Sequence, residues 1–478
     1  MAQTVRIEIP ATWAGLFINN EFVSSVDSQE RIEVINPATE ETICSVVAGS
    51  KEDIDVAVAA ARAAYSTTWG KNVTGFERSR LLNKLADLME RDMQVLAEVE
   101  SLNNGKPVKI ARDFDIGDSI QCLRYYAGWA DKIVGQNSLE LPHQHVVRAS
   151  RCFHLIALLA PALACGCTIV MKPSELTPLT ALMLSKLIAE AGFPPGVVNT
   201  VPSLGPIGGA ALSHHMDVDK VAFTGSTLTG RKIMEAAAKS NLKKACHIRE
   251  LGGKSPHIIF ESANLDQAAN WACLGILYNT GQDCTAGSRL YVQDTIYDKF
   301  LALLVDKAKQ LVIGDGFDEK SGGGPVRNMT RYGATSRVGR SHGARLVLGG
   351  EKRHGKGFFV DPTIFTDVTP DMRIIFGPVL SVGRFKTEEE AISLANDTSY
   401  GLGAGLHSTD ASQCMRVSSA LEAGTVWVNQ YNILGNNVPF GGKKQSGIGR
   451  ELGSYALKEY TEVKAVHWNF GEQADWPL

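Results

Sequence analysis

Short apolar runs alternate with helix-length segments from about residue 167 onward, and this alternation restricts the possible folds more than any other feature. The runs read CTIVMKP, VVNTVPS, KVAFTGS and SPHIIF. After the first run, residues 177–191 have helical periodicity, and the helix is expected to stop at Gly192, before Pro194 and Pro195. Strands and helices at this spacing predict parallel βαβ units in an open α/β sheet.

A second alternation begins after Leu251. Residues 262–278 read as a helix, a glycine-framed loop YNTGQDCTAGSR follows, and RLYVQ reads as a strand. Further strands are expected at ARLVLGG and AGTVWVNQ. A chain of 478 residues is long enough for two or three domains, so a second α/β domain is the simplest account.

Two shorter patterns add local detail. Ser50 and Asp53 resemble a capping box at the start of a helix that has apolar residues on one face. The apolar segment 155–171 falls short of the roughly 20 residues that a membrane-spanning helix needs, and Pro161 and Gly166 interrupt it. It predicts a buried helix that runs into a buried strand, and no membrane segment.

Composition excludes other classes of protein. A formal charge of −3 and the absence of basic runs argue against a nucleic-acid partner. The histidine pairs His143/His145 and His214/His215 lack metal-site spacing, so no metal is expected. The first residues show no signal peptide, and the nine cysteines suit a reducing compartment, so a cytoplasmic location is expected.

Ligands of open α/β sheets bind at the carboxyl ends of the strands, which draws attention to Lys172 and to Gly225–Ser226. The segment FTGSTLTG places small residues between a strand and a helix, where backbone N–H groups can face a phosphate. An ordinary turn is an equal alternative. Lys172 and Glu175 could bind a ribose through its hydroxyls, or could form a charge pair at a helix start.

Cys284 lies in a loop rich in Gly, Ser and Thr, which favours an accessible thiol over a core cysteine such as Cys273. Glu250 precedes two glycines that allow close backbone approach, although a surface carboxylate is the plain alternative. Asp283, beside the cysteine, would raise the pKa of the thiol if both side chains pointed into one pocket.

Together, several ordered segments resemble the NAD(P)-dependent aldehyde dehydrogenase superfamily, especially its general cytosolic and mitochondrial branch. The resemblance covers nearly the whole chain. Its segments are LFINNEFV, VINPATEETI, AGFPPGVVNTV, VAFTGST, ELGGKSP, GQDCTAGSR, IFGPVLSV and PFGGKKQSGIGRELG.

The resemblance implies a role for each matched residue. Cys284 matches the nucleophile that attacks the aldehyde carbonyl, and Glu250 matches the general base. Lys172 and Glu175 match contacts to the adenosine ribose, where Glu175 would repel a 2′-phosphate, so NAD is expected rather than NADP. The remaining expected cofactor-binding residues are Gly225, Ser226, Thr227, Gly230, Leu251 and Phe376.

The resemblance also implies an architecture: a Rossmann-type cofactor domain, an α/β catalytic domain and a small oligomerisation element. Their expected ranges are 1–134 with 151–251, then 252–460, and finally 135–150 with 461–478. The segment ALKEYTEVKAVHW resembles the strand that joins a neighbouring subunit, so a homotetramer or homodimer is expected. The expected substrate is a small aldehyde, with general aliphatic aldehydes favoured and betaine aldehyde and semialdehydes left open.

Four blocks depart from the family pattern. Between Leu141 and Ala160 the family's arm, a strand and a PWNFP-type turn are missing, and with them the asparagine that would stabilise the oxyanion; HVVRASRCFHLI could supply a replacement strand. KKACHIRELGG is lengthened before Glu250. Ile374 stands where a glutamate would hold the nicotinamide ribose, and SGGGPVRNMTRYG is shortened.

These departures leave alternatives open. Losing one oxyanion donor costs roughly 3–4 kcal/mol in the transition state, which slows an enzyme without abolishing it. The chain could therefore be an active enzyme, an inactive homologue that binds cofactor or subunits as a scaffold, or a protein that only cleaves esters or thioesters. A translation across misplaced exon boundaries would also produce such blocks.

Overall fold

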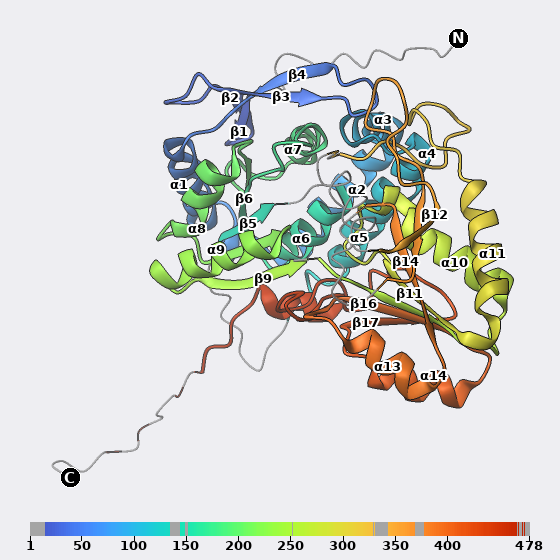
Figure 1. Cartoon of the computed structure of the whole chain (residues 1–478). Coiled ribbons are helices and arrows are strands. Elements are labelled where there is room, and N and C mark those ends of the chain that lie inside the picture. Colours follow the sequence, from blue (N-terminus) through green and yellow to red (C-terminus); the bar gives the residue numbers. More distant parts are fainter. Residues whose placement is uncertain are drawn as a thin grey trace.

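The computed structural model describes residues 15–133, 144–148, 152–250, 252–327, 329, 343–368, 377–465, 467, 471 and 473. For residues 144–148, 152–154 and 244–250 it describes the backbone and not the side chains. Two seven-stranded sheets with helices packed against them form the body of the protein (Figure 1). The α/β class predicted from the alternation is confirmed.

The first sheet has the strand order β2-β1-β7-β6-β5-β8-β9. Its five strands from β7 to β9 are parallel, and β1 and β2 form an antiparallel edge. The strands are β1 (Leu16–Ile18), β2 (Glu21–Val23), β5 (Gln144–Arg148), β6 (Thr168–Met171), β7 (Val198–Thr200), β8 (Lys220–Thr224) and β9 (Lys244–Glu250).

The replacement strand is present. β5 pairs with β6 on one side, His145 opposite Ile169, and with β8 on the other, His145 opposite Lys220. Residues 144–148 were grouped with an oligomerisation element from the sequence, and they lie instead in the middle of the first sheet. The sheet therefore has no gap at this point, because the shortened segment still provides a ladder for both neighbours.

The lengthened segment before Glu250 is also accommodated within the sheet. Lys220 of β8 pairs with Lys244 of β9, and four residues later Thr224 pairs with Glu250, which is six residues on. Two register shifts along this pair take up the difference of two residues. Such bulges bend and twist a strand, and they leave its ends in place. The carboxyl end of β9 therefore stays level with that of β8.

The second sheet has the order β12-β13-β14-β11-β10-β16-β17, in which only the edge strand β12 is antiparallel. Predicted strands at RLYVQ, ARLVLGG and AGTVWVNQ are confirmed. The strands are β10 (Pro256–Ile259), β11 (Arg289–Gln293), β12 (Arg345–Leu348), β13 (Thr363–Thr366), β14 (Val379–Phe385), β16 (Gly403–His407) and β17 (Thr425–Val428).

Two small ribbons complete the strands: β3 (Arg31–Ile35) pairs with β4 (Thr42–Val47), and β15 (Tyr400–Gly401) with β18 (Lys443–Lys444). The helices are α1 (Lys51–Thr67), α2 (Gly75–Arg91), α3 (Met93–Asn104), α4 (Val108–Ile110), α5 (Gly117–Ala127), α6 (Cys152–Ala164), α7 (Leu179–Ala191), α8 (Ala210–His214), α9 (Thr227–Lys239), α10 (Leu265–Leu277), α11 (Tyr297–Lys309), α13 (Glu388–Asn396) and α14 (Ala411–Ala420).

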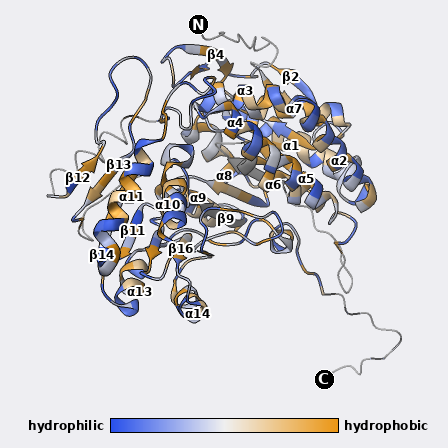
Figure 2. Cartoon of the chain, turned by 90° about the vertical axis from the view of Figure 1, so that its right-hand side faces the viewer, coloured by the Kyte–Doolittle hydropathy of each residue, from blue (hydrophilic) through white to orange (hydrophobic). Residues whose placement is uncertain are grey.

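Each sheet buries both faces. In β10, Ile258 packs with α13 and α14, whereas Ile259 packs with α10 and α11. In β6, Val170 packs with α1, α8 and α9, whereas Ile169 packs with α2, α5, α6 and α7. Successive residues of a strand face opposite sides, so both faces must be apolar. Figure 2 shows hydrophilic and hydrophobic stretches together along the outer helices such as α11.

The local predictions in the first half of the chain are confirmed. The Ser50 hydroxyl accepts from the Asp53 N–H while the Asp53 carboxylate accepts from the Ser50 N–H, which is the expected capping box. The apolar segment forms α6 and then β6, both buried where described. Helix α7 ends at Gly192, whose φ is +94°. Within the described ranges, no helix is long and apolar enough to cross a bilayer.

Candidate active site

Three of the predicted site residues follow or end parallel strands of the first sheet, β6, β8 and β9, with β5 between the first two. Lys172 comes directly after β6, Gly225 directly after β8, and Glu250 is the last residue of β9. Because these strands are parallel and paired in register, their carboxyl ends meet at one edge. The sequence analysis placed Lys172 and Gly225–Ser226 at strand ends, and each directly follows a strand here; the roles of all three residues in binding or catalysis stay predictions.

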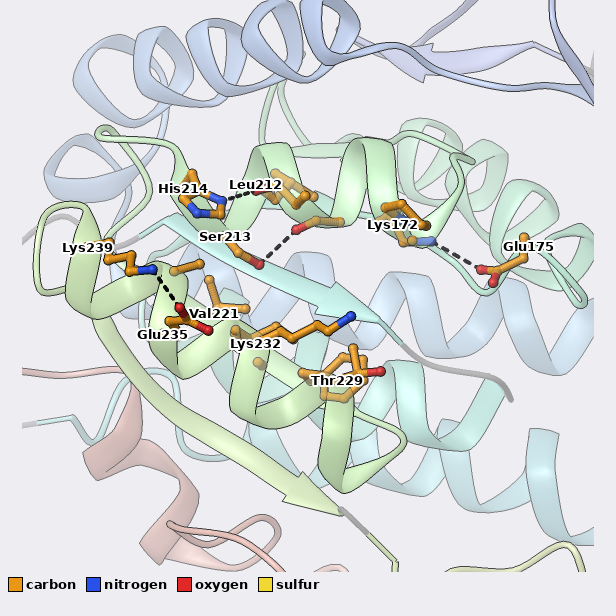
Figure 3. A pocket seen from close by; sticks show the side chains of 18 residues that line it. Lys172, Glu175, Leu212, Ser213, His214, Val221, Thr229, Lys232, Glu235 and Lys239 are labelled. Carbon is orange, nitrogen blue, oxygen red and sulfur yellow. Dashed lines mark hydrogen bonds and ion pairs between the residues drawn. The ribbon is translucent and has the colours of Figure 1, made fainter.

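A large cavity of about 660 Å³ opens between α8, α9 and the strands β6 and β8 (Figure 3). Lys172 and Glu175 lie at one end of it, and His214, Glu235 and Lys239 lie at the other. Between these ends, Lys232 of α9 points across the cavity. The walls also include the apolar side chains of Leu212, Val221 and Ile233.

Lys172 is almost completely buried, and two backbone carbonyls hold its ammonium group. Its Nζ donates to Pro173 O at 2.9 Å and to Ser203 O at 2.8 Å, and lies 3.6 Å from Glu175 Oε2. One face of the cavity therefore presents a cation and a carboxylate side by side. A sugar diol needs this combination, since each hydroxyl both donates and accepts a hydrogen bond.

The turn between β8 and α9 has the form that a phosphate requires. Ser226 caps α9, its hydroxyl accepting from the Thr229 N–H at 3.2 Å, and Thr227 begins the helix. Gly230 is buried in the first turn of the helix, and its N–H donates to Ser226 O. This turn joins the large cavity through Thr229. The donor set, the helix start and the apolar walls fit a dinucleotide.

The cysteine loop is held in an unusual backbone conformation. After α10, Asn279, Thr280 and Gly281 have φ values of +51°, +56° and +61°. A positive φ is rare for a β-branched residue such as Thr280, so the fold must stabilise it. Thr280 Oγ1 donates to Gly324 O at 3.0 Å, and Asn279 Nδ2 donates to Gln282 O at 2.9 Å. These bonds fix the direction from which the chain enters Cys284.

Cys284 and Asp283 point into one cavity. The sequence analysis named this arrangement as the one in which the carboxylate and the thiol would interact. The half-buried Cys284 Sγ donates to Asp283 Oδ1 at 3.6 Å. Asn432 Nδ2 donates to Asp283 Oδ2 at 2.5 Å, and Thr285 Oγ1 donates to Asn432 Oδ1 at 2.5 Å. The carboxylate is thus fixed by its Oδ2 while its Oδ1 faces the thiol.

Two glycine-containing motifs that resemble the family pattern lie against this loop. A Cβ added at Gly253, in the ELGG segment, would stand 3.0 Å from Cys284 O. A Cβ added at Gly281 would stand 2.2 Å from Gly377 O, in the Phe-Gly-Pro segment. The predicted residues Leu251 and Phe376 lie outside the described residues, as do the side chain of Glu250 and Ile374. Their roles stay predictions.

Cys284 lines a second cavity of about 190 Å³. Segments far apart in the sequence form it, and most of its residues were not foreseen from the sequence. Besides the three residues Asp283, Cys284 and Thr285, the lining consists of Phe114, Asp115, Asp118, Leu274, Tyr278, Asn432, Ile433, Leu434, Phe440, Glu451 and Leu452. The available signals were that Phe440, Glu451 and Leu452 belong to the PFGGKKQSGIGRELG segment of the family pattern, and that Tyr278 begins the cysteine loop.

The wall of this cavity includes an irregular helical turn. Residues Ala111–Ile116 form a π-helical turn between α4 and α5, and it carries Phe114 and Asp115 to the cavity. Such turns are common at functional sites because they shift side chains around the helix axis. Burial, and then the neighbouring Asp115 carboxylate, raises the pKa of Asp118 to about 6.

Neither cavity contains a metal-ligand arrangement. Across the parts of the chain that the structure describes, no three His, Cys, Asp or Glu side chains are grouped as metal ligands. His214 Nδ1 contacts Ala210 O at 3.0 Å, and His215 Nε2 lies 3.3 Å from Asp55 Oδ1. His143 lies outside the described residues.

Comparison with known proteins agrees with this geometry. The model of the aldehyde dehydrogenase family matches residues 22–466. An aldehyde dehydrogenase of Emericella nidulans is 50% identical over 96% of this chain and 95% of that protein. Aldehyde dehydrogenase 1A1 of Ovis aries is 48% identical over 98% of each chain. The NAD+ complex of an aldehyde dehydrogenase from Bacillus cereus has a TM-score of 0.92 at 45% identity and covers 96% of each chain.

Proposed function

The chain belongs to the aldehyde dehydrogenase family, and from that premise we propose that it oxidises aliphatic aldehydes to carboxylic acids through Cys284, with NAD as the hydride acceptor. One observation carries the proposal. The Cys284 thiol lines a cavity of substrate size, in a loop that packs against the segment following Glu250. The proposed nucleophile and the substrate space therefore lie next to the segment that follows the proposed base.

The chemistry has two halves. Glu250 takes the thiol proton, and the Cys284 sulfur attacks the aldehyde carbon to form a thiohemiacetal. Loss of hydride from that carbon leaves a thioester on Cys284. Water, deprotonated by Glu250, then attacks the thioester, releases the acid and returns the thiol. The sum is aldehyde, water and oxidised cofactor converted to acid, reduced cofactor and one proton.

The bound dinucleotide supplies the hydride acceptor, and this chain's residues position it. Lys172 and Glu175 would hold the adenosine ribose, while the turn from Gly225 to Gly230 would hold the pyrophosphate at the start of α9. In this assignment the first sheet belongs to the cofactor domain and the second sheet to the catalytic domain.

The oxyanion of the tetrahedral species needs a donor. The chain has no asparagine between Asn137 and Asn199, where the family pattern has one. We assign this task to the Cys284 N–H and to the second N–H of the Asn432 amide, whose other N–H donates to Asp283 in the same cavity. Losing one donor of several costs roughly 10² to 10³ in turnover, so a slow enzyme is expected rather than an inactive one.

The deciding experiment follows NADH absorbance after purified protein is mixed with NAD and propanal, and measures propanoic acid in the same samples. We expect NADH and acid in a ratio of one to one. Acid release from an ester without NADH from propanal would instead support a hydrolase. A folded protein that binds NAD and forms neither product would support the scaffold alternative.

Cofactor choice gives a separate prediction. Changing Glu175→Gln is expected to lower the preference for NAD over NADP about tenfold, because the neutral side chain no longer repels a 2′-phosphate. Lys232, which points across the same cavity, then becomes available to attract that phosphate. The ratio of kcat/KM for the two cofactors measures the effect.

A matched control is Glu235→Gln. Glu235 lies at the opposite end of the cavity and is paired with Lys239. The substitution removes one negative charge, as Glu175→Gln does, but at a position far from the proposed ribose site. The cofactor preference should therefore stay within about twofold of wild type. If both variants shift the preference equally, net charge and not a ribose contact is responsible.

We also propose that the carboxyl-terminal segment pairs with a neighbouring subunit. After η7 (Ser454–Glu459), the chain runs away from both sheets (Figure 1), and the apolar side chain of Val463 is fully exposed. An extended segment with an exposed β-branched residue is suited to add to another sheet edge. Truncation after Tyr460 should therefore convert an oligomer to monomers in light scattering.

A further inference from the structure

The substrate cavity carries one sign of charge. Four of the residues that line it are carboxylates, Asp115, Asp118, Asp283 and Glu451, and none of its lining residues is Lys, Arg or His. A cavity lined by one sign of charge with low-dielectric walls attracts ligands of the opposite charge. The proposed cysteine nucleophile lies in the same cavity, so the ligand on which this charge acts is the aldehyde substrate.

The carboxylates are not equivalent, because three of them already interact with other residues of the protein, the almost fully buried Glu451 among them. Asp115 forms a buried ion pair with Lys106, whose Nζ also lies 3.9 Å from Glu100 Oε1. Asp283 accepts from Asn432 and from the Cys284 thiol. These carboxylates therefore interact with groups of the protein itself and are less available to a ligand.

Asp118 differs from them. Its carboxylate makes no hydrogen bond or ion pair with any residue in the described part of the chain, although it is half-buried in the cavity wall. A half-buried carboxylate without a partner disfavours its own charged state. Groups of this kind concentrate at functional sites, where a ligand provides the missing interaction.

Aromatic rings in the same cavity favour the same ligand charge. Phe114 and Tyr278 both line it, with ring centroids 5.8 Å apart and an interplanar angle of 71°. The negative face of an aromatic ring attracts cations, above all large ammonium groups. This observation is independent of the carboxylates, since it would hold if Asp118 were neutral.

We propose that the cavity selects aldehydes that carry a cationic group, such as an amino or quaternary ammonium aldehyde, and that Asp118 is the residue that determines this specificity. The proposal rests on the function proposed above and narrows its substrate class. An anionic semialdehyde is disfavoured, because its carboxylate would meet three or four like charges with no cation among the lining residues.

The test compares two aldehydes of one shape and different charge: trimethylammonioacetaldehyde and its neutral isostere 3,3-dimethylbutanal. With NAD at pH 8, we expect kcat/KM for the cation to exceed that for the isostere about tenfold or more. Asp118→Asn should remove most of this preference, measured as the ratio of kcat/KM for the two aldehydes within the same variant, because the cation loses its partner and the neutral isostere does not. Equal values for both aldehydes in the wild type, or an unchanged ratio in the variant, would overturn the proposal.

The matched control is Asp113→Asn. Asp113 lies five residues before Asp118 but is exposed and bonded to Arg112, outside the cavity. It removes the same formal charge, so a change in the ratio there would assign the effect to net charge, against the proposal. An unchanged ratio in this variant supports the assignment to Asp118.

A pH series adds a second readout, because a quaternary ammonium keeps its charge at every pH. The cationic preference should fall as the pH drops below about 6, where Asp118 takes up a proton, and should not depend on pH in this way in Asp118→Asn. The other titratable groups near Asp118 are Asp115, Cys122, Tyr278, Asp283, Cys284 and Glu451. Wild type and variant share them, so the difference between the two profiles isolates Asp118.

A binding assay separates failure of this proposal from failure of the proposed function. Alkylation of Cys284 by iodoacetamide is followed by mass spectrometry with choline or its neutral isostere 3,3-dimethylbutan-1-ol present. Stronger protection by choline that disappears in Asp118→Asn supports the cation site even if no NADH forms. Equal protection by both compounds contradicts it, whether or not the enzyme turns over neutral aldehydes.

Discussion

Changing Cys284→Ala is expected to lower NADH formation from propanal and NAD by a factor on the order of 10⁴ or more. Removing a nucleophile from a covalent mechanism leaves only binding and electrostatic effects, which accelerate the reaction far less. The residue is half-buried and lines a cavity, so the smaller alanine side chain should affect folding little. NAD affinity, measured by calorimetry, should stay within about twofold, because the cofactor cavity is built from other elements.

Cys44→Ala is the matched control for that variant. Cys44 is also a half-buried free thiol, but it lies in the ribbon strand β4, and burial raises the pKa of its thiol. Its loss should leave turnover unchanged. Substantial NADH formation by the Cys284 variant would contradict the covalent mechanism. Equal losses of NADH formation in both variants would indicate general damage from cysteine replacement.

Local patterns explain how much of the fold could be predicted. The capping box at Ser50 and the stop at Gly192 follow from hydrogen bonds and backbone angles within a few residues. The buried strands of the α/β units stand out because both faces of each sheet are covered, which makes most residues of these strands apolar. The fold class could therefore be derived from the amino-acid sequence alone.

Pairing between strands far apart in the sequence explains two features that local patterns alone did not establish, the strand β5 and the register of β9. The strand β5 has the polar sequence QHVVR, and it is a strand because β6 and β8 provide partners on both sides. The two extra residues of β9 are taken up by register shifts against β8, which no local pattern reveals. In both cases the sheet determines the conformation of a segment that has a weak preference of its own.

The candidate site also contains residues that local motifs predict and residues that only the folded chain brings together. Cys284, Lys172 and the turn at Gly225 could be predicted, because their motifs are local and resemble a known family. Asp118 and Asn432 could not, because the cavity forms only when α5, the cysteine loop and the segment after β17 meet. The proposed specificity residue Asp118 and the proposed oxyanion donor Asn432 are thus less visible in the sequence than the proposed nucleophile and the expected cofactor-binding residues.

Changing Gly281→Ala is expected to lower kcat about 100-fold or more while NAD affinity stays nearly unchanged. The residue has a φ of +61°, and its added Cβ would stand 2.2 Å from Gly377 O, so one of the two backbones must move. Gly281 lies three residues before Cys284 and enters the same loop. A displacement of about 1 Å at a reacting group can cost about 10² in rate, because the attacking atom no longer meets the carbonyl in line.

Gly355→Ala separates the clash from backbone strain. Gly355 also has a positive φ, +106°, but an added Cβ there would meet no atom within 4 Å. Both variants should therefore lose about 1 kcal/mol of stability from the unfavourable φ, and Gly281→Ala should show the larger decrease in Tm because its Cβ also clashes with the Gly377 backbone. Only Gly281→Ala should lose turnover. If it keeps kcat within about threefold of wild type, the packing of the Gly377 segment on the cysteine loop does not position the thiol, and the loop bonds of Asn279 and Thr280 alone must do so.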